Sequence, residues 1–351
     1  MSVTAPNALQ NVIHKLAFHE PLTSGEAEQA FDVVMRGEAT AVQIAALLSA
    51  LRATGESPEV VAGVVRALRS AMVALPAENP DQLVDTCGTG GGTVATFNIS
   101  TAAAIVAAGA GVRIAKHGNR SFTTRCGSAD VLEALGVPID VPLATMEKGL
   151  RDTGIVFMFA PLMHPAMRHV GPIRRELGIP TVMNIVGPLA NPARAGRQVV
   201  GVADLERAPV LAGALSVLGS VHALVVYGEP GLDEVSPLGP THVVEVLNGT
   251  TRRWTIHPEE HGFRKVSPEE LAGGEPAENA RLIEKILNGG GPKGARAATV
   301  LNAAAAIYVS GRVEAFADGV AAAQNSIDTG SAKGVLESMR RAHARPIIAQ
   351  A

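Results

Sequence analysis

Aromatic side chains are scarce in this sequence, at 3% of 351 residues. Hydrophobic residues still make up 47% of the chain, so the core must be built from alanine, valine, leucine and isoleucine. An excess of charge is lacking too, because the net charge is −3 and lysine and arginine form no run longer than a pair. The composition therefore predicts a large globular protein, and the charge gives no support to nucleic-acid binding.

Cysteine and long apolar segments are also rare. The only cysteines are Cys87 and Cys126, and the N-terminus shows no basic region followed by an apolar stretch. The longest apolar run, residues 102–112, is too short to cross a bilayer. We therefore expect a cytoplasmic protein in a reducing compartment, without a membrane partner.

Several familiar catalytic motifs are missing. No Gly-Lys-Ser/Thr follows the glycine-rich turn, so this is not a Walker loop. Thr93 stands where a dinucleotide fingerprint has its third glycine, and no Gly-x-Ser-x-Gly marks an α/β-hydrolase. A zinc site made by Cys87, Cys126, His117 and His164 is a weak alternative, because these residues lack paired ligand spacing.

The chain is organised around residues 85–101. A β-branched strand at 82–86 leads into a glycine-rich turn, and a helix of alanine, isoleucine and valine follows at 102–110. Glycine permits φ > 0 and lets a ligand touch the backbone, while bare amides and a helix dipole attract anions. The turn and the helix start therefore predict a phosphate site, unless the turn is purely structural; their key residues are Gly88, Gly90, Gly91, Gly92, Asn98, Ser100 and Thr101.

A second polar loop, residues 116–128, follows the next predicted strand, 112–116. Its start, Lys116-His-Gly-Asn-Arg120, is basic where a dinucleotide site would have a carboxylate for the ribose. Lys116 is a point charge suited to phosphate, and Arg120 can make a forked contact. We expect this loop to bind a second phosphate group; a solvated basic loop is the alternative.

Two further stretches carry charge in a useful arrangement. Asp233 and Glu234 follow a strand at 223–227 and could hold Mg²⁺ together with waters and substrate phosphates, although such a pair is often a solvated turn. Arg174 and Arg175 adjoin in a helical segment, and one of them could recognise a carboxylate.

The element pattern predicts two domains. Residues 7–75 show four helices with capping boxes at Thr23 and Thr40 and a Ser57-Pro58 start, and no strand. Strands and helices then alternate, as in a mostly parallel α/β sheet. We expect a helical domain at 1–76, joined by 164–186, and an α/β domain at 80–160 and 187–351. The predicted strands are 83–86, 112–116, 155–159, 198–203, 222–227 and 242–247, with covering helices at 276–288, 294–309, 313–329 and 331–343.

Together the motifs resemble the anthranilate phosphoribosyltransferase family. The resemblance covers nearly the whole chain and rests on Gly-Thr-Gly-Gly with Thr-Phe-Asn-Ile-Ser-Thr, Lys-His-Gly-Asn-Arg, Cys-Gly-Ser-Ala-Asp-Val-Leu-Glu-Ala-Leu-Gly, His-Pro-Ala-Met and Gly-Leu-Asp-Glu. It implies a fold related to the pyrimidine nucleoside phosphorylases, usually a homodimer. It also implies transfer of phosphoribose from phosphoribosyl pyrophosphate to the amine of anthranilate, with Mg²⁺, in tryptophan biosynthesis.

The resemblance also implies which residues form the site. Phosphoribosyl pyrophosphate would contact Gly88, Gly91, Gly92, Thr96, Asn98, Ile99, Ser100, Thr101, Lys116, His117, Gly118, Asn119, Arg120, Ser121, Phe122, Thr123, Thr124 and Ser128. Mg²⁺ would contact Ser100, Asp233 and Glu234. Arg174 would hold the carboxylate of anthranilate beside Gly88 and Asn119, and His117 and His164 would line the path of that substrate.

One position departs from the family pattern. The family loop reads Gly-Thr-Gly-Gly-Asp, and this chain has Gly92 in place of the aspartate. Glycine avoids repulsion between a carboxylate and pyrophosphate, and it can take φ > 0, which aspartate tolerates less well. We expect the enzyme to depend more strongly on Mg²⁺ at Asp233 and Glu234.

The expected chemistry is glycosyl transfer at C1 of ribose. The amine of anthranilate is neutral at pH 7 and needs positioning rather than deprotonation, while Mg²⁺ and Lys116 would neutralise the leaving pyrophosphate. His117 is a candidate for removing a proton after attack. The alternatives are a pyrimidine nucleoside phosphorylase, in which the Asp233–Glu234 pair has no clear use, and a non-catalytic nucleic-acid-binding paralogue, which the net charge disfavours.

Overall fold

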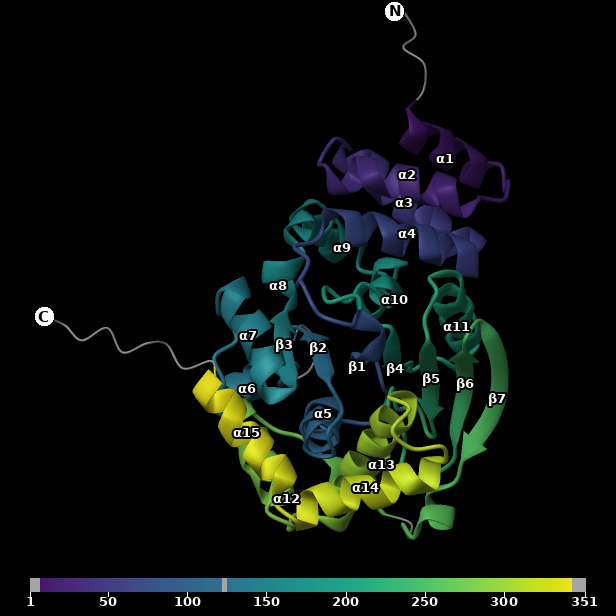
Figure 1. Cartoon of the computed structure of the whole chain (residues 1–351). Helices are drawn as coiled ribbons and strands as arrows, with labels where there is room; N and C mark the ends of the chain where they lie inside the picture. The colour runs from purple at the N-terminus through teal and green to yellow at the C-terminus, as the bar shows by residue number, and fades with distance from the viewer. Residues whose placement is uncertain (1–6, 122–124, 265, 343–351) are drawn as a thin grey trace, which may run out of the picture.

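The computed structural model describes residues 7–121, 125–264 and 266–342. One seven-stranded sheet, in the order β3-β2-β1-β4-β5-β6-β7, forms the centre of the molecule. Strands β1 to β5 are parallel where they pair, and β6 and β7 are antiparallel additions at one edge. Helices α1–α4 form a layer at one end, and α5 with α12–α15 covers the sheet on the opposite side (Figure 1). This arrangement confirms the α/β class and the mostly parallel sheet.

The element bounds follow the predicted pattern closely. The strands are β1 Val84–Gly88, β2 Ile114–Gly118, β3 Ile155–Phe159, β4 Arg197–Gly201, β5 His222–Gly228, β6 Thr241–Leu247 and β7 Thr250–Ile256. The α-helices are α1 Ala8–Ala17, α2 Ser24–Met35, α3 Ala41–Thr54, α4 Pro58–Ala71, α5 Ile99–Gly109, α6 Ser128–Ala134, α7 Leu143–Thr153, α8 Ala160–Met163, α9 Gly171–Leu177, α10 Met183–Val186, α11 Ala208–Val217, α12 Pro276–Leu287, α13 Lys293–Val309, α14 Phe316–Asp328 and α15 Ser331–Ala342. The 3₁₀ turns are η1 Pro80–Gln82, η2 Pro165–His169, η3 Gly187–Leu189, η4 Leu205–Arg207, η5 Pro258–His261 and η6 Pro268–Leu271.

The four N-terminal helices begin where their capping residues predict. The side chains of Thr23 and Thr40 each accept a hydrogen bond from the backbone N–H of the third helical residue, and the Glu26 or Gln43 side chain there accepts one from the backbone N–H of the threonine. Ser57 caps α4, whose first residue is Pro58. Both predicted capping boxes and the proline start are therefore confirmed.

Two boundaries near the glycine-rich turn differ from expectation. Strand β2 runs from Ile114 to Gly118 rather than over 112–116, so His117 lies in the sheet and not in the following loop. Helix α5 begins at Ile99, so Ser100 and Thr101 occupy its first turn. In both cases the strand or helix extends into a short polar segment, because the buried backbone groups of that segment need hydrogen-bond partners.

The two faces of the sheet have separate hydrophobic cores. On one face α5 and the C-terminal helices bury a mostly aliphatic cluster that includes Ile114 and Phe157. On the other face the core of α1–α4 continues without a break through residues 182–190 into α11 and the strands. Gly213 of α11 allows this contact, since a Cβ there would lie 2.8 Å from the Pro58 ring. The helical layer is thus packed directly onto the sheet domain through α11.

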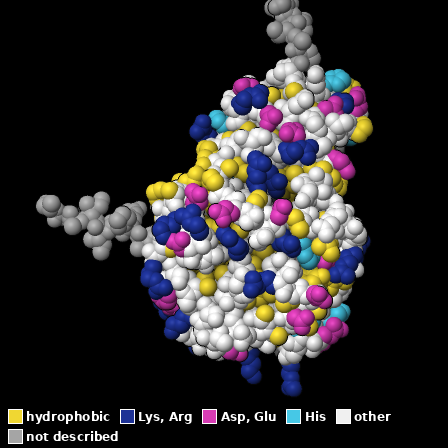
Figure 2. Space-filling model, viewed as in Figure 1, with side chains coloured by type: hydrophobic (Ala, Val, Ile, Leu, Met, Phe, Trp, Pro, Cys, Tyr) yellow, Lys and Arg dark blue, Asp and Glu magenta, His cyan; other side chains and the backbone are white. Residues whose placement is uncertain are grey.

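No helix in the described ranges is long and apolar enough to cross a membrane. On the face shown in Figure 2, acidic and basic side chains are interspersed over the surface. That face offers no extended basic patch of the kind that nucleic-acid binding requires.

Candidate active site

The carboxyl ends of the parallel strands bring the predicted motifs together. Strands β1 and β4 end at Gly88 and Gly201, and the backbone of Asp233 lies directly on both ends. A Cβ at Gly88 would come within 2.3 Å of Asp233 Oδ2, and one at Gly201 within 1.7 Å of the Asp233 carbonyl oxygen. Both positions require glycine because the loop that carries Asp233 and Glu234 packs directly against the strand ends. Gly201 was not predicted as part of the site.

The acidic pair is bonded to the glycine-rich turn and the helix start. Gly90 N–H donates to Asp233 Oδ2 at 2.8 Å, and Ser100 N–H donates to Glu234 Oε1 at 3.1 Å. Burial raises the pKa of both carboxyls, and the neighbouring Asp233 raises that of Glu234 further. The structure therefore joins two stretches that are more than 130 residues apart in sequence.

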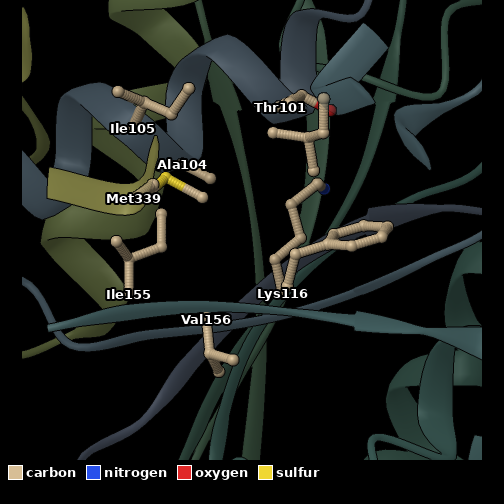
Figure 3. Close-up of a pocket in the computed structure, with 9 residues that line it drawn as sticks. Thr101, Ala104, Ile105, Lys116, Ile155, Val156 and Met339 are labelled. Carbon is tan, nitrogen blue, oxygen red and sulfur yellow. The ribbon is translucent and has the colours of Figure 1, made fainter. Parts of the chain in front are cut away.

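Lys116 lies beneath this loop with its ammonium group buried. Its Nζ donates to the Thr86 carbonyl oxygen, to Thr86 Oγ1 at 3.4 Å and to Ser100 Oγ at 3.2 Å. Burial lowers the pKa of Lys116, while nearby Asp85 and Glu234 oppose that effect. Figure 3 shows the side chain rising from β2 toward Thr101 beside a small cavity lined by Ile155, Val156 and Met339.

That cavity is not a substrate pocket. Its volume is about 10 Å³, which holds at most one water molecule. It lies along the aliphatic stem of Lys116, where Thr101 Oγ1 has no hydrogen-bond partner in the described part of the chain.

His117 and His164 lie together on the other face of the sheet. Their ring centroids are 4.9 Å apart, and Nε2 of each ring is buried without a hydrogen-bond partner among the residues that the structure describes. Burial lowers the pKa of His117 to about 3 and that of His164 to about 4. Both imidazoles are therefore neutral at pH 7, and both have an unused polar atom.

Two buried residues in this region were not predicted as site residues. Asp85 is fully buried, and its carboxylate accepts hydrogen bonds from His117 N–H at 3.2 Å and from Asn191 Nδ2 at 2.7 Å. Burial raises the pKa of Asp85 to about 6, opposed by Lys116 and these donors. The sequence signal was a carboxylate inside a predicted buried strand; nothing in the sequence marked Asn191 as its partner.

The second polar loop, residues 116–128, is fixed at both ends. Asp130 accepts from Ser121 N–H at 3.1 Å and Gly127 N–H at 2.8 Å, and Asn119 O accepts from Ala129 N–H. Ser128 begins α6, with its Cβ 3.1 Å from where a Cβ of Gly118 would lie. Phe122, Thr123 and Thr124 lie outside the described residues.

Arg120 is not directed at the strand ends. Its guanidinium forms ion pairs with Asp130 at 3.0 Å and Glu133 at 2.5 Å, and it lies 5.5 Å from the centre of the Phe159 ring. The forked contact that the sequence suggested for phosphate is made with a carboxylate of α6 instead.

The glycines of the first loop differ in backbone conformation. Gly90 and Gly91 have φ values of 72° and 85°, which favour glycine, whereas Gly92 is outside that region. The expectation that Gly92 exploits positive φ is therefore wrong. Space is what restricts this position, since a Cβ would lie 3.1 Å from Gly231 O and 3.5 Å from Asp233 Oδ1.

Three other predicted site residues, Thr96, Asn98 and Ile99, differ in burial and in their contacts. Asn98 donates to Cys126 O at 3.1 Å and accepts from Asn279 at 2.9 Å, so its side chain ties the loop to α12. The side chain of Ile99 is buried in the core, which leaves only its backbone for a ligand. Thr96 is partly exposed beside Gly273.

Arg174 is the more enclosed of the two adjacent arginines. It is partly buried in α9, whereas Arg175 is exposed. Its Nη2 donates to Asn184 Oδ1 at 3.3 Å, and burial lowers its pKa. Within the described chain no carboxylate forms an ion pair with Arg174, so this guanidinium is available for an acidic ligand.

The acidic pair fits a magnesium ion better than a transition metal. Among the described residues no group of three or more histidine, cysteine, aspartate and glutamate side chains could hold a metal, and the four residues of the zinc alternative do not form one. Mg²⁺ is usually held by one or two carboxylates with phosphates and waters. Asp233 and Glu234 supply such carboxylates, and a cation would offset the burial that raises the pKa of each.

Both parts of the chain match known families. The helical bundle domain of the glycosyl transferase family matches residues 10–72, and the a/b domain of that family matches residues 80–333.

Curated relatives match along almost the whole chain. An anthranilate phosphoribosyltransferase of Rubrobacter xylanophilus is 47% identical over 96% of this chain and 98% of its own length. The solved anthranilate phosphoribosyltransferase of Thermus thermophilus is 41% identical, covers 94% of this chain and 98% of its own, and gives a TM-score of 0.89. That of Saccharomyces cerevisiae, solved with phosphoribosyl pyrophosphate and Mg, is 31% identical over 95% and 97%, with a TM-score of 0.87.

Proposed function

The chain belongs to the anthranilate phosphoribosyltransferase family, and on that basis we propose that its active site is the edge of the sheet where β1, β2 and β5 end. The family reaction transfers the phosphoribosyl group of phosphoribosyl pyrophosphate to the amine of anthranilate. It gives N-(5-phosphoribosyl)anthranilate and pyrophosphate. The observation that supports this location is the link from Asp233 and Glu234 to the amides of Gly90 and Ser100, directly above Lys116.

The glycine-rich turn and the start of α5 would bind the pyrophosphate. Gly88, Gly91, Asn98, Ser100 and Thr101 surround the N-terminus of α5, where the helix dipole attracts anions. The proposed contacts extend to Gly92, Thr96 and Ile99 and to the second loop, Gly118, Asn119, Ser121 and Ser128. Arg120 can contact the pyrophosphate only after its ion pairs with Asp130 and Glu133 break.

Lys116 would neutralise charge on the leaving pyrophosphate. Its ammonium is held by uncharged oxygens of Thr86 and Ser100, so no carboxylate of the described ranges is bonded directly to its positive charge. A fixed cation in a buried site stabilises developing negative charge more strongly than one in water.

Mg²⁺ would be held by Asp233, Glu234 and Ser100. Its contribution is to shield the phosphate oxygens and favour departure of pyrophosphate. The relative solved with phosphoribosyl pyrophosphate and Mg supports this proposal.

Anthranilate would bind between Arg174 and the strand ends. The partly buried guanidinium suits a carboxylate. Gly88 at the end of β1 and Asn119 in the second loop are the other proposed contacts of this substrate. His117 and His164 would face the substrate as neutral rings, and the low pKa of His117 suits it to orient the amine more than to take up a proton at pH 7. A yeast relative solved with 4-fluoroanthranilate supports an aromatic carboxylate at this site.

The division into a helical domain at 1–76 with 164–186 and an α/β domain at 80–160 and 187–351 is part of the same proposal. It is supported by packing of α9 on α3 and of α10 on α4. We also propose that the enzyme works in the cytoplasm as a homodimer.

The deciding assay follows the fluorescence of anthranilate with phosphoribosyl pyrophosphate and Mg²⁺. Loss of fluorescence that requires both additions is expected. Phosphorolysis of a pyrimidine nucleoside, or salt-sensitive DNA binding without transfer, would favour the alternatives instead.

A further inference from the structure

The sheet is open between β1 and β2. Strand β1 pairs with β4 at five positions, and β2 pairs with β3 at five positions. Between β1 and β2 the backbone register contains a single pair, Val84 with Ile114. The two strands that carry the proposed phosphate loops therefore separate before they reach the site.

The missing part of the ladder can be identified. Val84 N–H donates to Arg113 O, so the next parallel step would join Thr86 N–H to Ala115 O and Thr86 O to His117 N–H. These four backbone groups are buried between neighbouring strands and each needs a partner.

Three side chains take the place of that step. The Asp85 carboxylate accepts from His117 N–H at 3.2 Å and from Thr86 N–H. Asn191 Nδ2 donates to Ala115 O at 2.8 Å, and Lys116 Nζ donates to Thr86 O.

Asp85 and Asn191 act as one unit. They are joined by a 2.7 Å hydrogen bond, and both are completely buried. Asn191 Oδ1 accepts from Ala193 N–H at 2.9 Å and Ala195 N–H at 3.4 Å, which anchors the unit in the segment after η3. A fully buried carboxylate is costly in free energy, and a plain ladder would have satisfied the same backbone groups without it.

We propose that Asp85 and Asn191 are positioning residues that hold β1 and β2 apart, so that Lys116 is directed to the pyrophosphate site and His117 to the anthranilate path. This inference rests on the proposed function, which places Lys116 against phosphoribosyl pyrophosphate. In a closed ladder Thr86 O would accept from His117 N–H, and Lys116 would have to share this one of its three acceptors with the ladder.

The hydrogen bond between Asp85 and Asn191 predicts how single and double variants of these two residues will differ. Asp85→Asn turns an amide N–H toward an existing N–H donor, either that of His117 or that of Asn191. Asn191→Asp instead sets two carboxylates against each other. The double variant Asp85→Asn/Asn191→Asp restores a donor facing an acceptor across the 2.7 Å contact, although Ala115 O loses its donor.

The test measures KM for each substrate and kcat for the two single variants, the double variant and Glu245→Gln. Each single variant is expected to raise KM for phosphoribosyl pyrophosphate on the order of 10-fold or more, and the double variant to recover most of that loss. Glu245→Gln is the matched control, because Glu245 is an equally buried carboxylate at the other end of the sheet and its loss should leave KM unchanged. If Asp85 and Asn191 only stabilised the fold, replacing them would lower the midpoint of unfolding without changing KM of the folded enzyme.

Single variants that keep KM for phosphoribosyl pyrophosphate within twofold of the parent would overturn the proposal, as would a double variant no better than either single one. If Asp85→Asn does not fold, Asn191→Ala decides, since it keeps the carboxylate and removes only the amide; an unchanged KM then counts against the proposal. Lys116→Met distinguishes failure of the proposed active site from failure of the positioning role. If it leaves KM and kcat unchanged, the proposed site is wrong; if it impairs them while the single variants do not, only the positioning role fails.

Discussion

The two ends of the sheet bury a carboxylate in opposite ways. At the β5–β7 end, the side chain of Glu245 is inaccessible to solvent and accepts hydrogen bonds from His222, Arg252, Trp254 and Tyr308, at 2.7 to 3.0 Å. These partners outweigh burial and lower the pKa of Glu245 to about 2. At the β1–β2 end, Asp85 is equally buried, but burial dominates and raises its pKa to about 6.

The difference shows what each end is built to hold. Glu245 is stabilised as an anion by donors within the protein, including Arg252, so this end needs nothing more. Around Asp85 the charged groups are incompletely matched: Lys116 is bonded to uncharged oxygens, and Asp233 and Glu234 are close neighbours of like charge. Such an excess of unmatched charge is typical of a functional site, where a charged ligand and a cation complete the pairing.

The largest expected effect comes from the acidic pair at the site end. Replacing Asp233 and Glu234 together by alanine should lower kcat/KM by about 10²-fold or more, because the Ser100 hydroxyl would be the only other proposed protein ligand left for Mg²⁺. Stability should change little, since burial already disfavours both ionised carboxyls. The measurement is a steady-state assay over a Mg²⁺ titration, with a denaturant curve for each protein. Undiminished activity at low Mg²⁺ would remove these residues from the metal site.

The second effect contrasts two arginines. Arg174→Ala should raise KM for anthranilate by on the order of 10²-fold, because a charge-assisted contact to the substrate carboxylate is lost. KM for phosphoribosyl pyrophosphate should change much less. Arg175→Ala is the matched control, since its side chain is exposed on the same helix. If Arg175→Ala instead gives the anthranilate effect, the carboxylate contact belongs to Arg175.

The smallest effect is expected at Gly92. An aspartate there would place a third carboxylate beside Asp233, since its Cβ would lie 3.5 Å from Asp233 Oδ1. We expect Gly92→Asp to reach half-maximal rate at a lower Mg²⁺ concentration, with KM for anthranilate within a few-fold. Gly92→Asn supplies the same shape without the charge. Coincident Mg²⁺ curves for the aspartate and asparagine variants would show that position 92 does not act on the metal.

The sequence predicted the elements of this fold better than the contacts between them. Capping residues such as Thr23 and Thr40 act within one helical turn, so their pattern is visible locally. The alternation of strands and helices likewise predicted the mostly parallel sheet.

Contacts across the sheet were not predictable in the same way. Asp85 lies in a stretch that the sequence marks as a buried strand, but its partner Asn191 is 106 residues away. Arg120 was expected to face phosphate, yet Glu133 on the following helix takes its guanidinium. Gly201 looks like an ordinary strand end until Asp233 is placed on it. Each of these depends on tertiary packing that local patterns do not contain.

We infer that burial of Asp85 costs stability for the sake of the site, whereas burial of Glu245 contributes stability. A raised pKa means that the cost of Asp85 grows as pH rises from about 4 to about 6, reaching on the order of 3 kcal/mol at pH 7. A lowered pKa means that the contribution of Glu245 is complete above about pH 4.5 and is lost as pH falls toward 2.

The most direct test is the free energy of unfolding of the parent, Asp85→Asn and Glu245→Gln between pH 3 and pH 8. The free energy of unfolding of Asp85→Asn minus that of the parent should rise by on the order of 3 kcal/mol as pH increases from 4 to 7. Glu245→Gln should instead lose on the order of 2 kcal/mol relative to the parent between pH 3 and pH 5, and stay less stable above that. Parallel curves for the two variants would show instead that both carboxylates are buried for the same purpose, and that Asp85 is not held at a cost to stability.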